Sequence, residues 1–165
     1  MDTPQEPTSP LPYPDPDARP SAAEPWDGPR QLRITISGRV FEARLETDRA
    51  PLTCRALLGL LPLQNKLLQT RWSGEAAWVP LGPRDIDVPY ENHTMYPLPG
   101  QLLLFRGGIS QPELLLAYGV TAFSSKVGPL AGNHAATIVG DPAQLAVIGQ
   151  LVLWEGAQDI LIEPA

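Results

Sequence analysis

One stretch of the chain, Tyr90–His134, constrains the fold and the site more than any other. Across its 45 residues formal charge occurs at only four positions, Glu91, Arg106, Glu113 and Lys126. Six glycines, several aromatic residues and isolated polar residues separate the apolar runs. A solvent-covered surface normally carries more charge than this. The stretch therefore predicts tightly turning, largely buried backbone, and a mostly apolar wall with few polar groups is typical of a small-molecule pocket.

Alternating apolar and polar residues precede this stretch. They alternate over residues 32–36 and again over 41–45, with a turn at Gly38 between the two runs. This period of two predicts an antiparallel hairpin with one buried face. Pro51 then begins a short amphipathic helix, predicted over residues 51–61.

The remaining segments predict a mainly β fold. Further strands are predicted at 69–73, 76–81, 101–106, 113–118, 135–139 and 158–163. A second helix is predicted from Pro142, with Asp141 as its cap and with Gly149 inside it at a cost of about 1 kcal/mol. Many short strands with two short helices favour a closed antiparallel β-barrel whose open ends the helices cover.

Residues 1–29 differ in composition from the rest of the chain. They hold nine of the 20 prolines and few apolar side chains. Such a segment cannot build a core, which predicts a disordered, partly polyproline-like tail. A ligand for a proline-recognising module is the alternative function for this tail. The folded domain is predicted to span residues 30–165, as a single barrel domain.

Charge and cysteine content exclude several classes of partner. The net charge is −6, no Lys or Arg follows Lys126, and no basic run exists, so no nucleic acid is expected. The acidic balance and the lack of an 18-residue apolar run predict no membrane partner. The single cysteine, Cys54, excludes an internal disulfide, is expected in the core, and favours a cytoplasmic location. The start of the chain lacks the features of a signal peptide.

Several motifs occur in an order known from another group of proteins. They are Q-T-R-W-S-G-E-A-A-W-V-P-L from Gln69, E-N-H-T-x-Y-P-x-P-G from Glu91, S-x-x-E ending at Glu113, A-Y-G, F-S-S-K-V-G, and G-N-H ending at His134. Over roughly residues 32–163 the chain resembles an uncharacterised bacterial family of unknown function with a cyclophilin-like fold. The resemblance implies an eight-stranded barrel with an open, pocketed face, and no established reaction.

The likeness to the cyclophilins themselves is more distant. Their opening strand pair and A-P-x-T helix resemble the segment that ends in A-P-L-T, at residues 50–53. The isomerases carry a Phe-His-Arg strand whose arginine polarises the amide before a proline. Here the corresponding position offers Thr70-Arg71-Trp72, and the rest of the proline groove is not recognisable. Peptidyl-prolyl isomerase activity is therefore an alternative function rather than the leading one.

Arg71 is the first candidate for chemistry. A guanidinium fork beside a pocket binds a carboxylate or an amide oxygen with two hydrogen bonds. Alternation along the predicted strand places Arg71 and Ser73 on one face and Trp72 on the other. The competing interpretation is an ion pair between Arg71 and a carboxylate, either Glu75 or Glu113.

Two carboxylates and a histidine are candidates for acid–base work. Glu91 and Glu113 would suit it if burial raised their pKa values. The alternative for Glu91-Asn92 is a turn whose side chains bond the local backbone. His134, after Asn133, is a candidate general base or neutral donor. We expect Arg71, Glu113 and His134 to meet at one pocket, and no ligand spacing indicates a metal site.

The sequence thus predicts a barrel that binds a small polar molecule, bearing a carboxylate or an amide, in a pocket on its face. Lys126 either faces an acidic ligand group or extends to solvent. The predicted ligand-binding residues are Arg71, Trp72, Glu75, Glu91, Asn92, Tyr96, Glu113, Tyr118, Phe123, Lys126, Asn133 and His134. Alternatives are a hydrolase or isomerase using Glu91, Glu113 or His134, and an interaction module without chemistry. No nucleotide-binding motif is present and no cofactor is implied. The oligomeric state stays open, a homo-oligomer included.

Overall fold

The computed structural model of the protein describes residues 25–165. Most of the predicted tail, residues 1–24, lies outside the described residues. The segment 25–29, also assigned to the tail from sequence, contacts helix α1 (Pro51–Leu58). The Arg55 guanidinium carbon lies 5.0 Å from the centroid of the Trp26 ring, and an Arg55 nitrogen lies 3.3 Å from an Asp27 oxygen.

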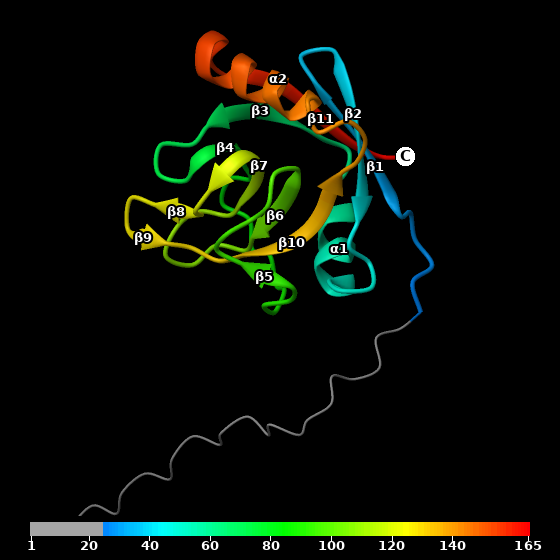
Figure 1. The fold of residues 1–165 in the computed structure, drawn as a ribbon. Helices are drawn as coiled ribbons and strands as arrows, with labels where there is room; N and C mark the ends of the chain where they lie inside the picture. The colour runs from blue at the N-terminus through cyan, green and yellow to red at the C-terminus, as the bar shows by residue number, and fades with distance from the viewer. Residues whose placement is uncertain (1–24) are drawn as a thin grey trace, which may run out of the picture.

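Eight strands close into an antiparallel barrel, as the sequence predicts (Figure 1). Around the ring the order is β2-β1-β11-β3-β4-β7-β6-β10, and β10 pairs with β2 to complete it. The bounds are β1 Gln31–Ile36, β2 Arg39–Leu45, β3 Leu63–Gln69, β4 Gly74–Pro80, β6 Gln101–Phe105, β7 Glu113–Thr121, β10 Gly132–Ile138 and β11 Gln158–Pro164. Outside the ring, β5 (His93–Thr94) pairs with β10, and β8 (Ser124–Ser125) forms a hairpin with β9 (Gly128–Pro129).

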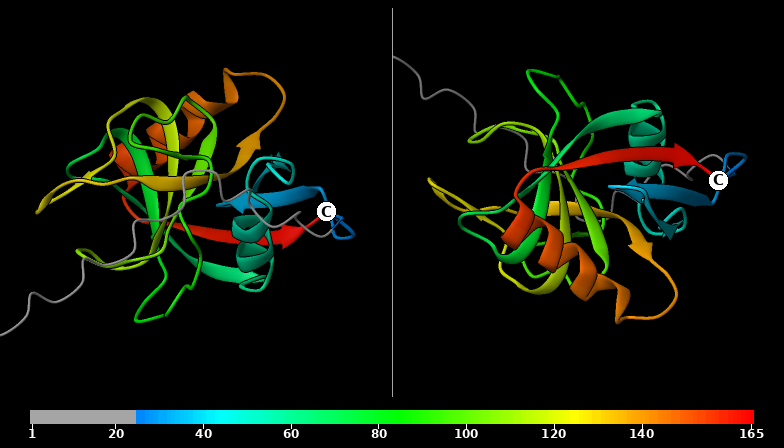
Figure 2. Two further views of the ribbon diagram at one scale, coloured as in Figure 1. Left: turned by 90° about the horizontal axis from the view of Figure 1, so that it is seen from below. Right: turned by 90° about the horizontal axis from the view of Figure 1, so that it is seen from above.

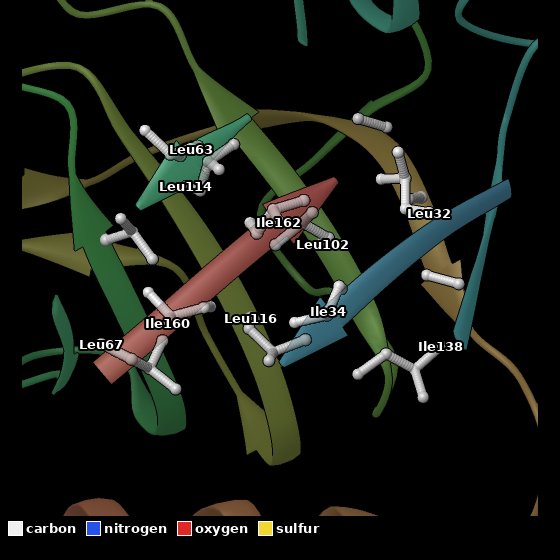
Figure 3. Close-up of a cluster of buried hydrophobic side chains, with 14 of the residues drawn as sticks. Leu32, Ile34, Leu63, Leu67, Leu102, Leu114, Leu116, Ile138, Ile160 and Ile162 are labelled. Carbon is white, nitrogen blue, oxygen red and sulfur yellow. The ribbon is translucent and has the colours of Figure 1, made fainter. Parts of the chain in front are cut away.

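The main core fills the barrel with leucine and isoleucine side chains. Residues from opposite walls meet there, among them Ile34, Leu67, Leu102, Leu116 and Ile160, each no more than 2% exposed (Figure 3). Burying such a side chain contributes about 1.5–3 kcal/mol. Because strands from all parts of the chain supply these residues, the core fixes the whole ring at once.

A second, smaller apolar cluster lies on the opposite face of β4, β6 and β7. Side chains alternate along a strand, so Leu114 and Leu116 point into the barrel while Leu115 points away from it. The outward cluster comprises Ala76, Leu103, Phe105, Leu115, Phe123 and Leu130. Phe123 and Leu130 flank the β8–β9 hairpin, so this hairpin covers the outer face of β7. Burial on both faces explains the uninterrupted apolar run from Leu114 to Ala117 in β7.

The predicted hairpin of β1 and β2 is confirmed, but the strand predicted at 69–73 is wrong. The strand in that region is β3, Leu63–Gln69, and residues 70–73 form the turn into β4. Only Leu63 and Leu67 of β3 reach the core, four residues apart, because Asn65 between them bonds the Pro80 carbonyl at 2.7 Å. This polar interruption hides the period of two.

The two predicted helices are present, with altered bounds. Helix α1 ends at Leu58, one turn before the predicted end. Helix α2 (Gln144–Gln150) begins two residues after Pro142 and continues into a π-helical turn, η1 (Leu151–Glu155). Figure 2 shows α1 and α2 on opposite sides of the barrel. Within residues 25–165 no helix has the length and apolar character needed to cross a bilayer.

Gly149 has a packing role that its sequence position does not show. A Cβ atom at this position would lie 2.8 Å from Cε2 of Tyr118, on β7. The glycine therefore allows α2 to approach the barrel wall closely.

We predict that Gly149→Ala destabilises the protein by about 1–3 kcal/mol, because the clash outweighs the gain in helix propensity. Gly59→Ala is the matched control. Gly59 has a φ of −66°, and its added Cβ would contact nothing closer than 3.4 Å. Denaturant unfolding of both variants measures the difference. Equal stabilities of the two variants would contradict the close approach of Tyr118.

Candidate functional site

A cavity of about 480 Å³ lies beside the second apolar cluster. Four segments surround it: the β3–β4 turn, the loop before β7, the β8–β9 hairpin, and the end of η1. Its lining comprises Leu68, Gln69, Thr70, Arg71, Trp72, Ser73, Trp78, Ser110, Gln111, Glu113, Ser124, Ser125, Lys126, Val152, Gly156 and Ala157. The sequence predicts four of these, Arg71, Trp72, Glu113 and Lys126, and the structure brings them to one place.

The β3–β4 turn is held by its own side chains. Thr70 Oγ1 donates to the carbonyl of Gly74 or of Ala76, at 3.2 and 3.0 Å, and the Thr70 amide donates to Ala76 at 3.1 Å. Arg71 and Trp72 at the tip of this turn are exposed. The turn therefore presents a cation and an aromatic ring to the mouth of the cavity.

Ser73 joins this turn to the β8–β9 hairpin. Its hydroxyl donates to the Ser124 carbonyl at 3.0 Å and accepts from the Ser124 amide at 3.1 Å. The Ser73 carbonyl also accepts from the Ala122 amide at 3.0 Å. Ser73 is only 2% exposed, so these bonds are shielded from water. Two walls of the cavity are thereby fixed to each other.

Glu113 is the first residue of β7 and lies on the same face as Leu115. Its residue is 9% exposed, and burial raises the pKa of its carboxyl to about 7. No residue between 25 and 165 donates a hydrogen bond to this carboxyl or forms a salt bridge with it. A buried carboxyl without a partner is costly when ionised, which explains the raised pKa.

The expected ion pair of Arg71 with a carboxylate is absent from the described part of the chain. The Glu75 carboxylate instead accepts from the Val120 amide at 2.7 Å, where β4 and β7 shift register. The prediction of strand alternation at Arg71, Trp72 and Ser73 is also wrong, since all three lie in the turn.

The expectation that Arg71, Glu113 and His134 share one pocket is wrong for the histidine. His134, on β10, does not line the cavity. It lies beside Asn92, with 3.4 Å between His134 Nδ1 and Asn92 Nδ2. Its Nε2 lies 2.8 Å from Thr137 Oγ1, which donates to Glu46 at 2.9 Å.

This arrangement indicates that the imidazole of His134 is uncharged. Because the Thr137 hydroxyl donates to Glu46, it accepts from Nε2–H, and Nδ1 is left to accept from Asn92. Burial lowers the pKa of His134, and the nearby Glu46 carboxylate opposes that shift. The side chain of His134 is 9% exposed. His134 thus belongs to a closed hydrogen-bond chain within the barrel wall.

Glu91 caps helix α1 from outside the helix. Its carboxylate accepts from the Leu52 amide at 3.3 Å, the Thr53 amide at 2.8 Å and the Thr53 hydroxyl at 2.8 Å. The residue at the cap position, Ala50, has no side chain that can do this. Asn133 completes the group, donating to Thr53 Oγ1 at 2.9 Å and to the Pro89 carbonyl at 2.8 Å.

The remaining predicted site residues lie apart from the cavity. Tyr96 is exposed, and Phe123 is buried in the second cluster. The Tyr118 hydroxyl donates to Gln69 Oε1 at 2.8 Å, and Gln69 itself lines the cavity. Burial raises the pKa of Tyr118. Tyr118 therefore supports the cavity through Gln69.

The sequence reasoning missed several cavity residues. The largest is Trp78 on β4, which packs against the second apolar cluster and is half-buried. Ser110, Gln111, Ser124 and Ser125 were also missed. Trp78 lies in the quoted Q-T-R-W-S-G-E-A-A-W-V-P-L motif, so the motif itself was the signal for it.

Within residues 25–165, no three His, Cys, Asp or Glu side chains lie close enough to hold a metal ion together. Cys54 is buried on α1, with its sulfur 3.4 Å from the Ala135 carbonyl oxygen. Burial raises the pKa of this thiol to about 12, which makes it an unreactive core residue.

A family model for a protein of unknown function, DUF3830, matches residues 32–163. The chain belongs to the DUF3830 family. No protein with a curated description matches it in sequence.

Solved structures place this DUF3830 member among cyclophilin-like folds. McbB in complex with tryptophan aligns with a TM-score of 0.61 at 19% identity, over 80% of this chain and 44% of McbB, so the chain spans less than half of that protein. A hypothetical protein of Archaeoglobus fulgidus aligns with a TM-score of 0.56 at 20% identity, over 83% and 95% of the two chains. A cyclophilin-type peptidyl-prolyl isomerase of Cryptosporidium parvum aligns with a TM-score of 0.51 at 12% identity, over 82% and 98%. These likenesses concern the fold alone.

The raised pKa of Glu113 predicts a pH-dependent stability. In the unfolded chain a glutamate loses its proton near its ordinary pKa of 4.5, whereas folded Glu113 keeps it to about pH 7. The folded state therefore binds more protons in this window, and the free energy of unfolding falls as pH rises from 4.5 to 7, by on the order of 2 kcal/mol. Glu113→Gln should remove this fall.

Urea unfolding of both proteins at several pH values measures the effect. Both proteins keep His134, whose lowered pKa reduces stability as pH falls below 6.5, so the difference between the two curves isolates Glu113. A difference that does not vary with pH would show that Glu113 is not shielded from water.

Loss of the external cap should weaken helix α1. We predict that Glu91→Ala lowers the free energy of unfolding by about 1–2 kcal/mol, since two amide donors lose their acceptor. Glu91→Gln is the control, because its amide oxygen still accepts and less stability is lost. Thermal unfolding compares the two variants, and an unchanged melting temperature in Glu91→Ala would contradict the capping role.

Proposed function

We propose that the protein binds a small carboxylate-bearing molecule with a large apolar or aromatic group, in the cavity between the β3–β4 turn and the β8–β9 hairpin. The observation that supports this most is the combination of two tryptophans with two cations around one space. Arg71 and Lys126 are exposed where they line it, and Trp72 and Trp78 supply its aromatic surface. The free thiol of Cys54 is compatible with a cytoplasmic protein.

The cavity has the size and composition of a ligand site. Its volume of about 480 Å³ falls within the roughly 300–1,000 Å³ of small-molecule pockets. Trp72 is 59% exposed, so its ring is accessible to a bound molecule. A bound aromatic group would contact this ring and that of Trp78.

The cations favour a carboxylate over a neutral oxygen. Neither Arg71 nor Lys126 pairs with a carboxylate among residues 25–165, so both are free to bind an anion. A guanidinium binds a carboxylate with two parallel hydrogen bonds. McbB, which has the same fold, is known in complex with tryptophan, a molecule that has both a carboxylate and an aromatic group.

Acid–base catalysis is a second candidate function, favoured by Glu113 alone. A carboxyl with a pKa of about 7 can both accept and donate a proton at neutral pH. It lines the same cavity, so a bound molecule would meet it. Binding is the primary proposal, and proton transfer on the bound molecule is the reaction that Glu113 would support.

The quenching of tryptophan fluorescence on binding provides the test. Indole-free acids, such as 3-phenylpropionate, are titrated together with their amides. We predict saturable binding of an aromatic acid and weaker binding of its amide. Arg71→Met should reduce affinity for the acid by about tenfold or more, since a charge-assisted hydrogen bond contributes roughly 1.5–3 kcal/mol.

Arg33→Met is the matched control, because Arg33 is an exposed cation on β1 that does not line the cavity. Equal losses in both variants would indicate a general charge effect. If no aromatic molecule that bears a carboxylate, with or without an amine, binds the wild-type protein, the proposed function is wrong.

A further inference from the structure

Glu113 differs from every other buried polar residue that the structure describes. The others are Thr47, Thr53, Ser73, Thr121, Asn133, His134 and Gln158. Each of these has a hydrogen-bond partner within the protein. Glu113 has none among residues 25–165, although more than nine-tenths of it is buried.

The little exposure that Glu113 keeps is toward the cavity. No side-chain oxygen or nitrogen that is wholly shut off from solvent lacks a partner in the described residues, so the Glu113 oxygens are not sealed in the core. Glu113 lines the cavity, and the residues beside it in the lining, Ser110 and Gln111, belong to the loop before β7. The carboxyl is therefore in a position to meet a donor that the protein does not supply.

Charges of opposite sign are separated within this one space. The buried carboxyl of Glu113 belongs to a strand of the barrel, whereas the exposed cations Arg71 and Lys126 belong to the turn and the hairpin around it. No nitrogen of either cation lies within 4.0 Å of the Glu113 carboxylate. The carboxyl and the two cations thus line one cavity without pairing with one another.

A ligand that pairs with Glu113 and also with Arg71 and Lys126 must carry a positive and a negative charge. A carboxylate alone would satisfy the cations and leave Glu113 without a donor, and an amine alone would do the reverse. The aromatic surface of Trp72 and Trp78 then selects an apolar body between or beside the two charged groups. Resting on the function proposed above, we propose that the ligand is a zwitterion, an amino acid with a large apolar side chain, whose ammonium group pairs with Glu113 while its carboxylate binds Arg71 and Lys126.

Pairing with an ammonium group requires Glu113 to be ionised. With a pKa of about 7 in the empty cavity, the carboxyl is partly protonated at neutral pH. Binding of the ammonium group then releases a proton, and affinity falls as pH drops, by up to about tenfold per pH unit below the pKa. A carboxylate that lacks the amine should show no such release, since Glu113 stays protonated beside it.

Isothermal titration calorimetry with three related probes tests the proposal. The probes are tryptophan, indole-3-propionate without the amine, and tryptamine without the carboxylate. We predict that tryptophan binds at least tenfold more tightly than either analogue. Titrations in two buffers of different ionisation enthalpy should show proton release for tryptophan at pH 7, and none for indole-3-propionate.

Variants separate this inference from the proposed function. Glu113→Gln should weaken the binding of tryptophan at least tenfold and abolish the proton release that accompanies it. The affinity for indole-3-propionate should stay the same or increase. Glu42→Gln, an exposed carboxylate on β2 outside the cavity, is the control and should change neither probe. If indole-3-propionate binds the wild-type protein as tightly as tryptophan does, the zwitterion is wrong and the carboxylate site stands. If tryptophan, phenylalanine and the aromatic acids all fail to bind, both are wrong.

Discussion

Closure of the barrel depends on the pairing of β10 with β2. In this register Ala136 faces Leu45 and Ile138 faces Ala43, joining residues that are some 90 positions apart in the chain. The same strand β10 pairs with β6 through Leu103 and carries a register shift between His134 and Ala136. A closed ring has no exposed edge for another strand to join. The walls that carry the cavity are therefore held in place by a contact on the far side of the ring.

Polar side chains of the barrel wall serve two purposes, structural hydrogen bonding and the lining of the cavity. Around α1, Glu91, Thr53 and Asn133 satisfy one another, and around β10, His134, Thr137 and Glu46 do the same. Closed networks of this kind fix a structure, and they offer nothing to a ligand. The cavity differs from both networks. Among residues 25–165, its buried carboxyl has no hydrogen-bond donor and its two cations have no carboxylate partner. Some polar side chains of the barrel therefore make structural hydrogen bonds, and others belong to the proposed site.

The sequence predicts the barrel well because alternation is strong where one face is buried, as in β1 and β2. It fails at β3, where Asn65 occupies an inward position and satisfies the Pro80 carbonyl. The sequence therefore predicts Arg71 on a strand, whereas the structure places it in the β3–β4 turn.

The carboxylates show a similar limit on the candidate site. Glu91 and Glu113 are both isolated in nearly uncharged sequence, so the pattern cannot distinguish them. The difference is a partner 38 residues away: the Thr53 amide bonds Glu91, while no described group bonds Glu113. Contacts between residues so far apart in sequence arise from the topology of the fold. The E-N-H segment lies next to the start of α1 because the closed ring brings the two together. The topology likewise sets the partners of His134, Asn92 and Thr137, which the sequence pattern does not reveal.

The hydrogen bonds between Ser73 and Ser124 also bear on how a ligand would enter and leave. Because they lock the β3–β4 turn to the β8–β9 hairpin, the cavity wall exists before any molecule arrives. Ligands would then meet a turn and a hairpin that are already held together, so neither of these two segments has to become ordered on binding. Discrimination among ligands would lie in residence time, set by how well each one engages the groups inside. If the cavity binds a ligand as proposed, this buried serine would place its selectivity in the dissociation step.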